Sequence, residues 1–280
     1  MVDVLVTGTD EFDKPLGALV GVSRLRLERT HMEAAVAEVR FVPGREELSE
    51  ADAIHVWNGL GKASLPVFER HTMNTVNLTV TPSGADHSSQ VQHGWVLATN
   101  DRRTAVTLLP SMVVVQTSAY DHYSTSLGNP LTEALRLFVE ATGAAVVQRI
   151  GLRYINRLQD AEAVAPVFWQ DHVRPAFAGP LVGETAPLVE ALHQQVQLQL
   201  DATAGARVQS GVFREQGVES RYSFLVDLDV YREQALDFDE TLVANMTRQL
   251  NRTALALFAQ VLSEKYWAEL GPVPVEGVTT

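Results

Sequence analysis

Gln148-Arg149-Ile150-Gly151-Leu152-Arg153-Tyr154-Ile155-Asn156-Arg157-Leu158 is the most informative segment of this 280-residue chain. Because side chains alternate across a β-strand, the segment is predicted to be a strand with two unlike faces. One face carries three arginines, and the other carries Ile150, Leu152, Tyr154, Asn156 and Leu158. A buried charge without a partner is strongly destabilising, so acidic groups must neutralise these arginines.

A second segment, Phe224-Leu225-Val226-Asp227-Leu228-Asp229-Val230-Tyr231, alternates in the same way. Its two aspartates share one face, and the other face is apolar. Two carboxylates on a strand need cations as much as the arginines need anions. We therefore expect Asp227 and Asp229 to meet Arg153 and Arg157 in ion pairs between neighbouring strands.

The same residues also allow a functional interpretation, in which the arginine face is a pocket for an anion or another small ligand. Gly151 lies between two of the arginines and leaves the sheet surface open to close approach. The candidate site residues are Arg149, Arg153, Tyr154, Asn156, Arg157, Asp227 and Asp229. Replacing Arg153 by Met separates the interpretations, because unfolding supports ion pairing and a stable fold without a ligand response supports the pocket.

Three helices are predicted around these strands. Ser49, with Asp52 three residues later, resembles a capping box and predicts a helix over 49–60. Asn129-Pro130 and Gly143 have the residue types that begin and end a helix. Asp239 is expected to cap a long terminal helix.

The remaining ordered sequence favours strands. Alternating or β-branched stretches predict strands at residues 35–41, 75–80, 94–99, 104–109, 112–117, 146–158, 208–213 and 222–231. Alternating glutamines and aliphatic residues favour another strand over 188–200. The polar stretch 84–93 is predicted to be a loop.

The order of these elements predicts an α+β protein built from two similar halves. Residues 31–145 and 146–270 each show the order strand, helix, antiparallel strands, helix. Two curved antiparallel sheets, each backed by a long helix, would bury the apolar faces. Residues 1–30 are expected to form an atypical leader, and residues 271–280 a flexible tail.

Composition excludes several classes of protein. Lys and Arg total 22 and Asp and Glu total 34, so the formal net charge is −12. This balance argues against a general affinity for nucleic acid or for an anionic membrane. The absence of cysteine excludes disulfides, thiol catalysis and thiolate metal sites. Without a charged and apolar signal segment or a long apolar run, we expect a soluble cytoplasmic protein.

Motifs for catalysis or cofactor binding are not found. Gly59-Leu60-Gly61-Lys62-Ala63-Ser64 resembles a phosphate-binding loop, but Val56 and Ala63 replace the required glycine and hydroxyl residue. We therefore expect it to be a helix end. The eight histidines have no HxxxH or HExxH spacing, and no GxSxG sequence is present. The sequence predicts no catalytic residue, no metal and no cofactor.

The segment Arg149–Arg157 resembles the RxGLRYINR signature of a sporadically distributed prokaryotic family of uncharacterised proteins. Glu33–Phe41 is similar to the opening strand of that family, and Phe224–Tyr231 to its late strand. The resemblance covers most of residues 31–270, whereas the first thirty residues depart from it. It implies a bacterial protein of a single module and brings no activity, cofactor or catalytic residue.

We expect a binding or assembly protein that recognises a protein partner or a small anionic ligand and self-associates. The sporadic distribution of the resembled family would suit an accessory defence or toxin–antitoxin component. A second hypothesis is an enzyme that holds a small polar substrate with the three arginines and uses Asp227 or Asp229 as its base. A third, nucleic-acid binding on a saddle-like sheet, conflicts with the acidic charge and with the 7% aromatic content.

Overall fold

A computed structural model describes residues 11–19, 25–27, 32–81, 84–217 and 221–274 of the chain. Much of the predicted leader and the end of the predicted tail lie outside these residues. Within the leader, the backbone N–H of Leu16 donates to Thr253 Oγ1 at 3.0 Å, and Leu16 is buried. The described chain is an α+β fold, as predicted.

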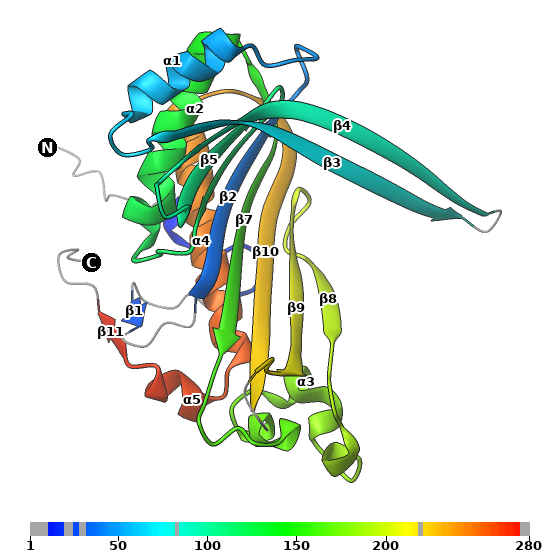
Figure 1. The fold of residues 1–280 in the computed structure, drawn as a ribbon. Coiled ribbons are helices and arrows are strands. Elements are labelled where there is room, and N and C mark those ends of the chain that lie inside the picture. Colours follow the sequence, from blue (N-terminus) through cyan, green and yellow to red (C-terminus); the bar gives the residue numbers. More distant parts are fainter. Residues whose placement is uncertain (1–10, 20–24, 28–31, 82–83, 218–220, 275–280) are drawn as a thin grey trace, which may run out of the picture. The chain divides into compact units, whose positions relative to one another are not determined.

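Nine strands form one antiparallel sheet in the order β3-β4-β5-β6-β2-β7-β10-β9-β8 (Figure 1). Their bounds are β2 Met32–Phe41, β3 Val67–Thr81, β4 Gly84–Ala98, β5 Thr104–Leu109, β6 Met112–Thr117, β7 Val146–Leu158, β8 Gln194–Gln199, β9 Ala204–Arg214 and β10 Tyr222–Asp237. A second, two-stranded sheet pairs β1, Leu25–Leu27, with β11, Pro272–Pro274.

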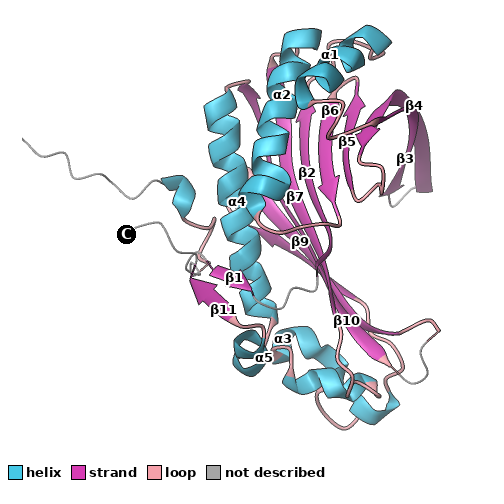
Figure 2. Ribbon diagram, turned by 60° about the vertical axis from the view of Figure 1, so that its left-hand side comes forward, coloured by secondary structure: helices cyan, strands magenta, loops and turns pink. Residues whose placement is uncertain are grey.

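Helices pack behind the nine-stranded sheet (Figure 2). The α-helices are α1 Glu50–Leu60, α2 Asn129–Thr142, α3 Pro175–Ala178, α4 Glu240–Val261 and α5 Glu264–Glu269. Short helical turns are η1 Glu11–Asp13, η2 Ser124–Gly128, η3 Pro166–Asp171, η4 Gly179–Leu181 and η5 Ala186–Leu188. Within the described ranges, no helix has the length and apolar character needed to cross a membrane.

The predicted helix boundaries are confirmed at three of four ends. Ser49 Oγ accepts from the backbone N–H of Asp52 at the start of α1, and Asp239 Oδ1 accepts from Leu242 N at 2.8 Å. Gly143 ends α2 in a left-handed conformation with φ of 70°. Asn129 was expected at the N-cap, but its backbone is already helical because the π-turn η2 leads directly into α2.

The prediction of a loop over 84–93 is wrong. Strand β4 begins at Gly84 and pairs with β3 in a continuous register, from Thr81 opposite Gly84 to Val67 opposite Ala98. The polar composition was misleading because a strand pairs through its backbone, and only its burial requires apolar side chains. The strand favoured within 188–200 is confirmed as β8.

Contacts divide the chain into two compact units, which are described separately. Unit 1 contains Met1–Ala35, Gly151–Glu233 and Ala244–Thr280, and unit 2 contains Val36–Ile150 and Gln234–Val243. Strands β2, β7 and β10 each contribute residues to both units. The bounds of these units differ from those of the predicted halves, residues 31–145 and 146–270. The similarity between the two halves of the sequence stays a prediction.

The core of unit 2 is aromatic and closely packed. Phe41 on β2 contacts Phe138 on α2 and Phe238, with ring centroids 5.5 and 6.0 Å apart. Phe41 and Phe138 are almost fully buried. Gly59 lies against Leu137, so a side chain at position 59 would collide with α2. Gly61 ends α1 with φ of 88°, which confirms that the glycine-rich segment is a helix end.

The core of unit 1 lies between its strands, α4 and the short helices near η3. Trp169 is fully buried, and its indole N–H donates to Tyr222 O at 3.1 Å. Phe224 and Tyr266 pack against the same ring. Tyr154 Oη on β7 donates to Asn251 Oδ1 on α4 at 2.8 Å. These contacts hold α4 against one face of the unit 1 strands.

Candidate functional site

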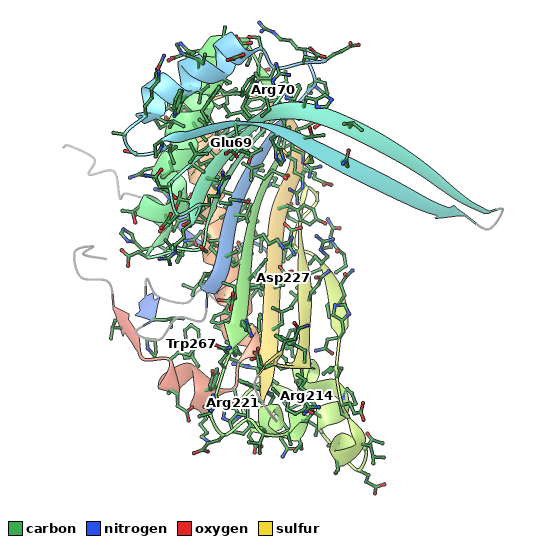
Figure 3. All side chains as sticks on the ribbon, viewed as in Figure 1. Glu69, Arg70, Arg214, Arg221, Asp227 and Trp267 are labelled. Atoms are coloured by element: carbon green, nitrogen blue, oxygen red, sulfur yellow. The ribbon has the colours of Figure 1, made fainter. Side chains whose placement is uncertain are left out.

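Unit 1 has a polar sheet surface on the side away from α4, which we call the open face (Figure 3). Cross-strand register brings its rows together: Asp227 lies opposite Gln209, which lies opposite Gln195. In the next row Asp229 lies opposite Arg207, which lies opposite Gln197. The open face consists of Arg153, Arg157, Gln195, Gln197, Gly205, Arg207, Gln209, Asp227, Asp229 and Tyr231.

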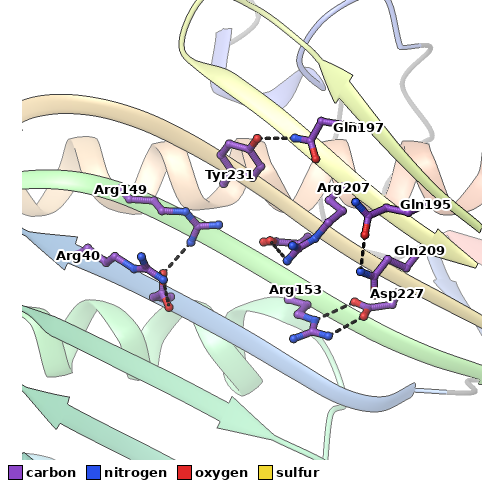
Figure 4. Close-up of polar contacts among 11 residues, drawn as sticks. Arg40, Arg149, Arg153, Gln195, Gln197, Arg207, Gln209, Asp227 and Tyr231 are labelled. Atoms are coloured by element: carbon purple, nitrogen blue, oxygen red, sulfur yellow. Dashed lines mark hydrogen bonds and ion pairs between the residues drawn. The ribbon is translucent and has the colours of Figure 1, made fainter. Parts of the chain in front are cut away.

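Arg153 and Asp227 form a bidentate ion pair on the open face, as predicted (Figure 4). Arg153 Nε donates to Asp227 Oδ1 at 2.8 Å, and Nη2 donates to Oδ2 at 2.6 Å. The carboxylate side chain is 7% exposed and the guanidinium side chain is 44% exposed. Hydrogen bonding to Asp227 raises the pKa of Arg153 above its usual range, against the opposing effect of partial burial.

The prediction that Arg157 meets Asp229 is wrong. Arg157 Nε donates to Glu215 Oε1 at 2.8 Å, Nη2 contacts the second oxygen of Glu215, and Nη1 donates to Glu33 Oε1 at 3.4 Å. The reason is strand direction. In an antiparallel pair, moving along β7 from Arg153 towards Arg157 leads away from Asp229 on β10.

Asp229 instead pairs with Arg207, directly opposite it on β9. Arg207 Nη2 and Asp229 Oδ2 are 3.0 Å apart, and the two side chains are 41% and 15% exposed. The carboxylate is again the better buried partner. In both ion pairs the acid therefore lies close to the sheet backbone, and the guanidinium extends towards solvent.

Arg149 lies in unit 2 and has its own partner there. Its Nη1 donates to Glu38 Oε1 at 2.7 Å, and these side chains are only 15% and 19% exposed. Arg40 also donates to Glu38, with Nε 2.7 Å from Oε1. One half-buried carboxylate is thus shared between two guanidinium groups.

Tyr154 and Asn156, the remaining candidates on β7, do not reach the open face. Tyr154 is 5% exposed and bonds to Asn251 on α4. Asn156 is 5% exposed, and its Nδ2 donates to Val226 O at 3.4 Å. Because alternate residues of a strand point to opposite sides, both lie on the face that packs against the core. They stabilise unit 1 and have no access to a ligand on the open face.

The sequence interpretation missed three ion-pair partners and the amide network. Glu215, Arg207 and Glu33 were not singled out, although Arg207 and Glu215 share the parity of Gln209 along the β9 segment. Gln197 Nε2 donates to Tyr231 Oη at 2.6 Å, and Gln209 Nε2 donates to Gln195 Oε1 at 2.8 Å. Alternation along 204–215 was the signal that could have revealed Arg207, Gln209 and Glu215.

Gly205 explains how Tyr231 reaches this network. A Cβ atom at position 205 would lie 2.7 Å from Tyr231 Oη and 3.1 Å from the backbone oxygen of Leu198. Only glycine lets the tyrosine ring lie flat across β9 towards β8. The ring therefore links β10 to the edge strand through Gln197.

Among the described residues, the charges of the open face are compensated. Three guanidinium groups, of Arg153, Arg157 and Arg207, meet four carboxylates, of Glu33, Glu215, Asp227 and Asp229. An anionic ligand would have to compete with these carboxylates. Both oxygens of Asp227 accept from Arg153, which leaves Asp227 poorly suited to act as a general base. No group of three or more potential metal-ligating side chains occurs in the described residues.

Comparison with protein-family models finds no match for the chain, and comparison with curated proteins finds none either. Among solved structures, the S. pombe Pct1 RNA triphosphatase in complex with the Spt5 CTD shares 6% identity. The alignment covers 84% of this chain and 85% of that chain, with a TM-score of 0.11. A similarity of this size says nothing about either fold or function.

Proposed function

We propose that this chain is a binding and assembly protein that acts in the cytoplasm, recognises a polypeptide through the open face of unit 1, and self-associates. The asymmetry of the ion pairs Arg153–Asp227 and Arg207–Asp229 supports this proposal most directly. In each pair the acid is the more buried partner, with a side chain 7% or 15% exposed, and the guanidinium side chain is more than 40% exposed.

A neutralised, outward-facing guanidinium remains a hydrogen-bond donor. Arg153 uses Nε and Nη2 for Asp227, and its Nη1 has no partner among the described residues. Such a group suits neutral acceptors, for example the backbone carbonyls of a partner. Arginine and tyrosine are also enriched in protein interfaces, and the open face carries both types beside adaptable glutamine amides.

The charge of the face favours a polypeptide over a small anion. Among the described residues, four carboxylates contact the three guanidinium groups of the open face, so these residues offer no excess of positive charge to a phosphate or a carboxylate ligand. The same arrangement favours binding over catalysis, since each aspartate proposed as a base is held by an arginine: Asp227 by Arg153 and Asp229 by Arg207. Membership of the family with the RxGLRYINR strand, and an accessory role in defence, are part of this proposal.

Site-specific photo-cross-linking in cells that naturally make the protein tests the proposal. We would introduce p-benzoylphenylalanine at Gln209 on the open face and, as a matched control, at exposed Asn58 on α1. Discrete polypeptide adducts are expected at Gln209 and not at Asn58. Adducts at neither position, together with a thermal stabilisation by phosphate, pyrophosphate or citrate that Arg207→Gln removes, would instead support the anion-pocket interpretation.

A further inference from the structure

Strand β8 is the last strand at one side of the sheet. Whether a residue number is odd or even decides whether its backbone groups point towards β9 or outwards. The backbone N–H groups of Leu192 and Leu200 donate inwards to Val212 O and Ala204 O on the β9 side. Backbone groups alternate in direction along a strand. The N–H and C=O groups of Gln195, Gln197 and Gln199 therefore point away from β9.

Among the described residues, these outward groups have no backbone partner, because β8 is the last strand in the order of the sheet. No backbone hydrogen bond from Gln195, Gln197 or Gln199 to another described segment is present. All three residues are exposed, and Val196 between them is 38% exposed. Natural proteins protect such edges with lysine, proline, bulges or a covering segment. Gln194–Gln199 contains neither a charge nor a proline.

The sequence of this edge is symmetric about its centre. Gln195-Val196-Gln197-Leu198-Gln199 has the same polar and apolar order in both directions. We propose that β8 pairs with β8 of a second copy of this chain, antiparallel, about a twofold axis at Gln197. This interface rests on the proposed function, which includes self-association, and it places the contact between the copies at β8.

This register satisfies the free backbone groups. Gln197 lies opposite Gln197 of the second copy, and Gln195 lies opposite Gln199. Outward-facing residues that oppose each other exchange two N–H···O bonds per pair. On the reverse face Val196 meets Leu198 of the second copy, so the exposed apolar side chain is covered.

The side-chain amides are also complementary in this register. Gln195 already accepts through Oε1 from Gln209, which leaves its Nε2 as a donor. Gln199 donates through Nε2 to Asp201 O, which leaves its Oε1 as an acceptor. The free donor of one copy thus faces the free acceptor of the other. Gln197 uses one N–H for Tyr231, and the amide retains a second N–H and its oxygen.

Charge permits the approach of two acidic chains at this strand. The chain carries a net charge of −12, but the six residues of β8 carry none. One pair beyond the strand, the same register sets His193 against Asp201 of the second copy. Within the described residues 193–201, no two like charges face each other in this register, so the edge favours a second copy.

Sedimentation equilibrium of the full chain tests the proposal, with Gln197→Pro as the disrupting variant. The N–H of residue 197 points outwards, so proline removes no bond to β9 while it blocks the central pair of the interface. We expect the dissociation constant of the dimer to rise at least about tenfold. The matched control Gln197→Thr also loses the amide side chain but keeps the N–H, and should remain a dimer.

Because the chain has no cysteine, a single introduced thiol reports the register. Opposed residues of a hydrogen-bonded antiparallel pair have Cα atoms about 5.5 Å apart, which a disulfide can span. Oxidised Gln197→Cys should form a covalent dimer, whereas Gln199→Cys alone should not. The double variant Gln195→Cys/Gln199→Cys should form one, because positions 195 and 199 of the two copies lie opposite each other.

Two results would overturn the proposal. In the first, Gln197→Pro remains a dimer and oxidised Gln197→Cys forms no disulfide. The chain would then self-associate, but through a surface other than β8. A wild-type chain that stays monomeric at concentrations up to about 1 mM would remove both the β8 interface and the proposed self-association.

Discussion

Two ion pairs in this protein share a contact geometry and differ in their surroundings. Arg153 holds Asp227 on the open face of unit 1 through bonds of 2.8 and 2.6 Å. In unit 2, Arg102 holds Glu69 through bonds of 3.0 and 2.6 Å. Asp227 is 7% exposed, whereas Glu69 is 50% exposed. Similar distances therefore describe one pair whose acid depends on its partner and one pair whose acid is solvated by water.

Burial of the acid explains the difference. A carboxylate removed from water depends on its partner for the solvation that it has lost, and removal of that partner leaves an uncompensated charge. A carboxylate in water recovers its solvation at once, and its ion pair is screened by salt. The comparison can be tested by substitutions in these pairs. The loss in the free energy of unfolding should be larger where the acid is more deeply buried.

The largest effect is expected from Arg153→Met. The substitution leaves the buried Asp227 carboxylate without its bidentate donor, and we expect a loss of about 2 kcal/mol in the free energy of unfolding, a value reduced for the exposure of the guanidinium. Urea unfolding followed by circular dichroism measures it. An unchanged midpoint would show that Asp227 does not depend on Arg153, and would support an open pocket at this position.

A double-mutant cycle sharpens the same point. Combining Arg153→Met with Asp227→Asn should return part of the lost stability, since the variant no longer buries a charge, and gives a coupling energy of about 1.5 kcal/mol. The equivalent cycle of Arg102→Met with Glu69→Gln should give no coupling beyond experimental error in 0.15 M salt. Equal coupling in both cycles would contradict the role assigned to burial.

A smaller effect with a defined pH dependence is expected at Asp201, in the turn between β8 and β9. Burial acts to raise the pKa of Asp201, but hydrogen bonds from Thr203 and Ala204 and the charge of Arg232 outweigh it and lower the pKa below 3.8. The stability contributed is therefore present above pH 3.8 and is lost as the pH falls through the lowered pKa.

Asp201→Asn should accordingly lower the free energy of unfolding by about 0.5 kcal/mol at pH 7. The difference from wild type should shrink as the pH falls below 3.8, because the wild-type carboxylate is then protonated as well. Urea unfolding at several pH values measures this difference. A difference that stays constant down to pH 2.5 would exclude the charge of Asp201 as the cause.

The smallest effect is expected from Arg102→Met. Its hydrogen bond to Glu69 lowers the pKa of that carboxyl below 4.5, so any contribution would be present above pH 4.5 and lost below it. Because both side chains are exposed, we expect the thermal midpoint at pH 7 to match that of wild type within error. A loss as large as that of Arg153→Met would show that the two pairs do not differ as their burial indicates.

Local sequence signals were enough to place most elements. Alternation along 146–158 and 222–231 predicted β7 and β10, and the residue types at Ser49 and Asp239 predicted the start of α1 and α4. These signals are reliable because each depends only on residues a few positions apart. The prediction of a loop at 84–93 was wrong because local signals do not include pairing with another strand. This segment is a strand through its pairing with β3.

The candidate site was only partly predictable. Alternation correctly assigned Arg153 to one face and Tyr154 to the other, and charge balance correctly required an acid for Arg153. It could not identify Glu215 as the partner of Arg157, because many carboxylates satisfy the same requirement. Choosing among them needs the register of three strands.

By itself the sequence determined that charged residues on one face of a strand need opposite charges, since an unpaired charge removed from water is unfavourable in any fold. It also determined which residues share a face, because the alternation of a strand is a property of the backbone. Only the tertiary structure decided which acid meets which arginine and how deeply each acid is buried. Those outcomes depend on strand direction and register, which arise from contacts between segments far apart in the chain.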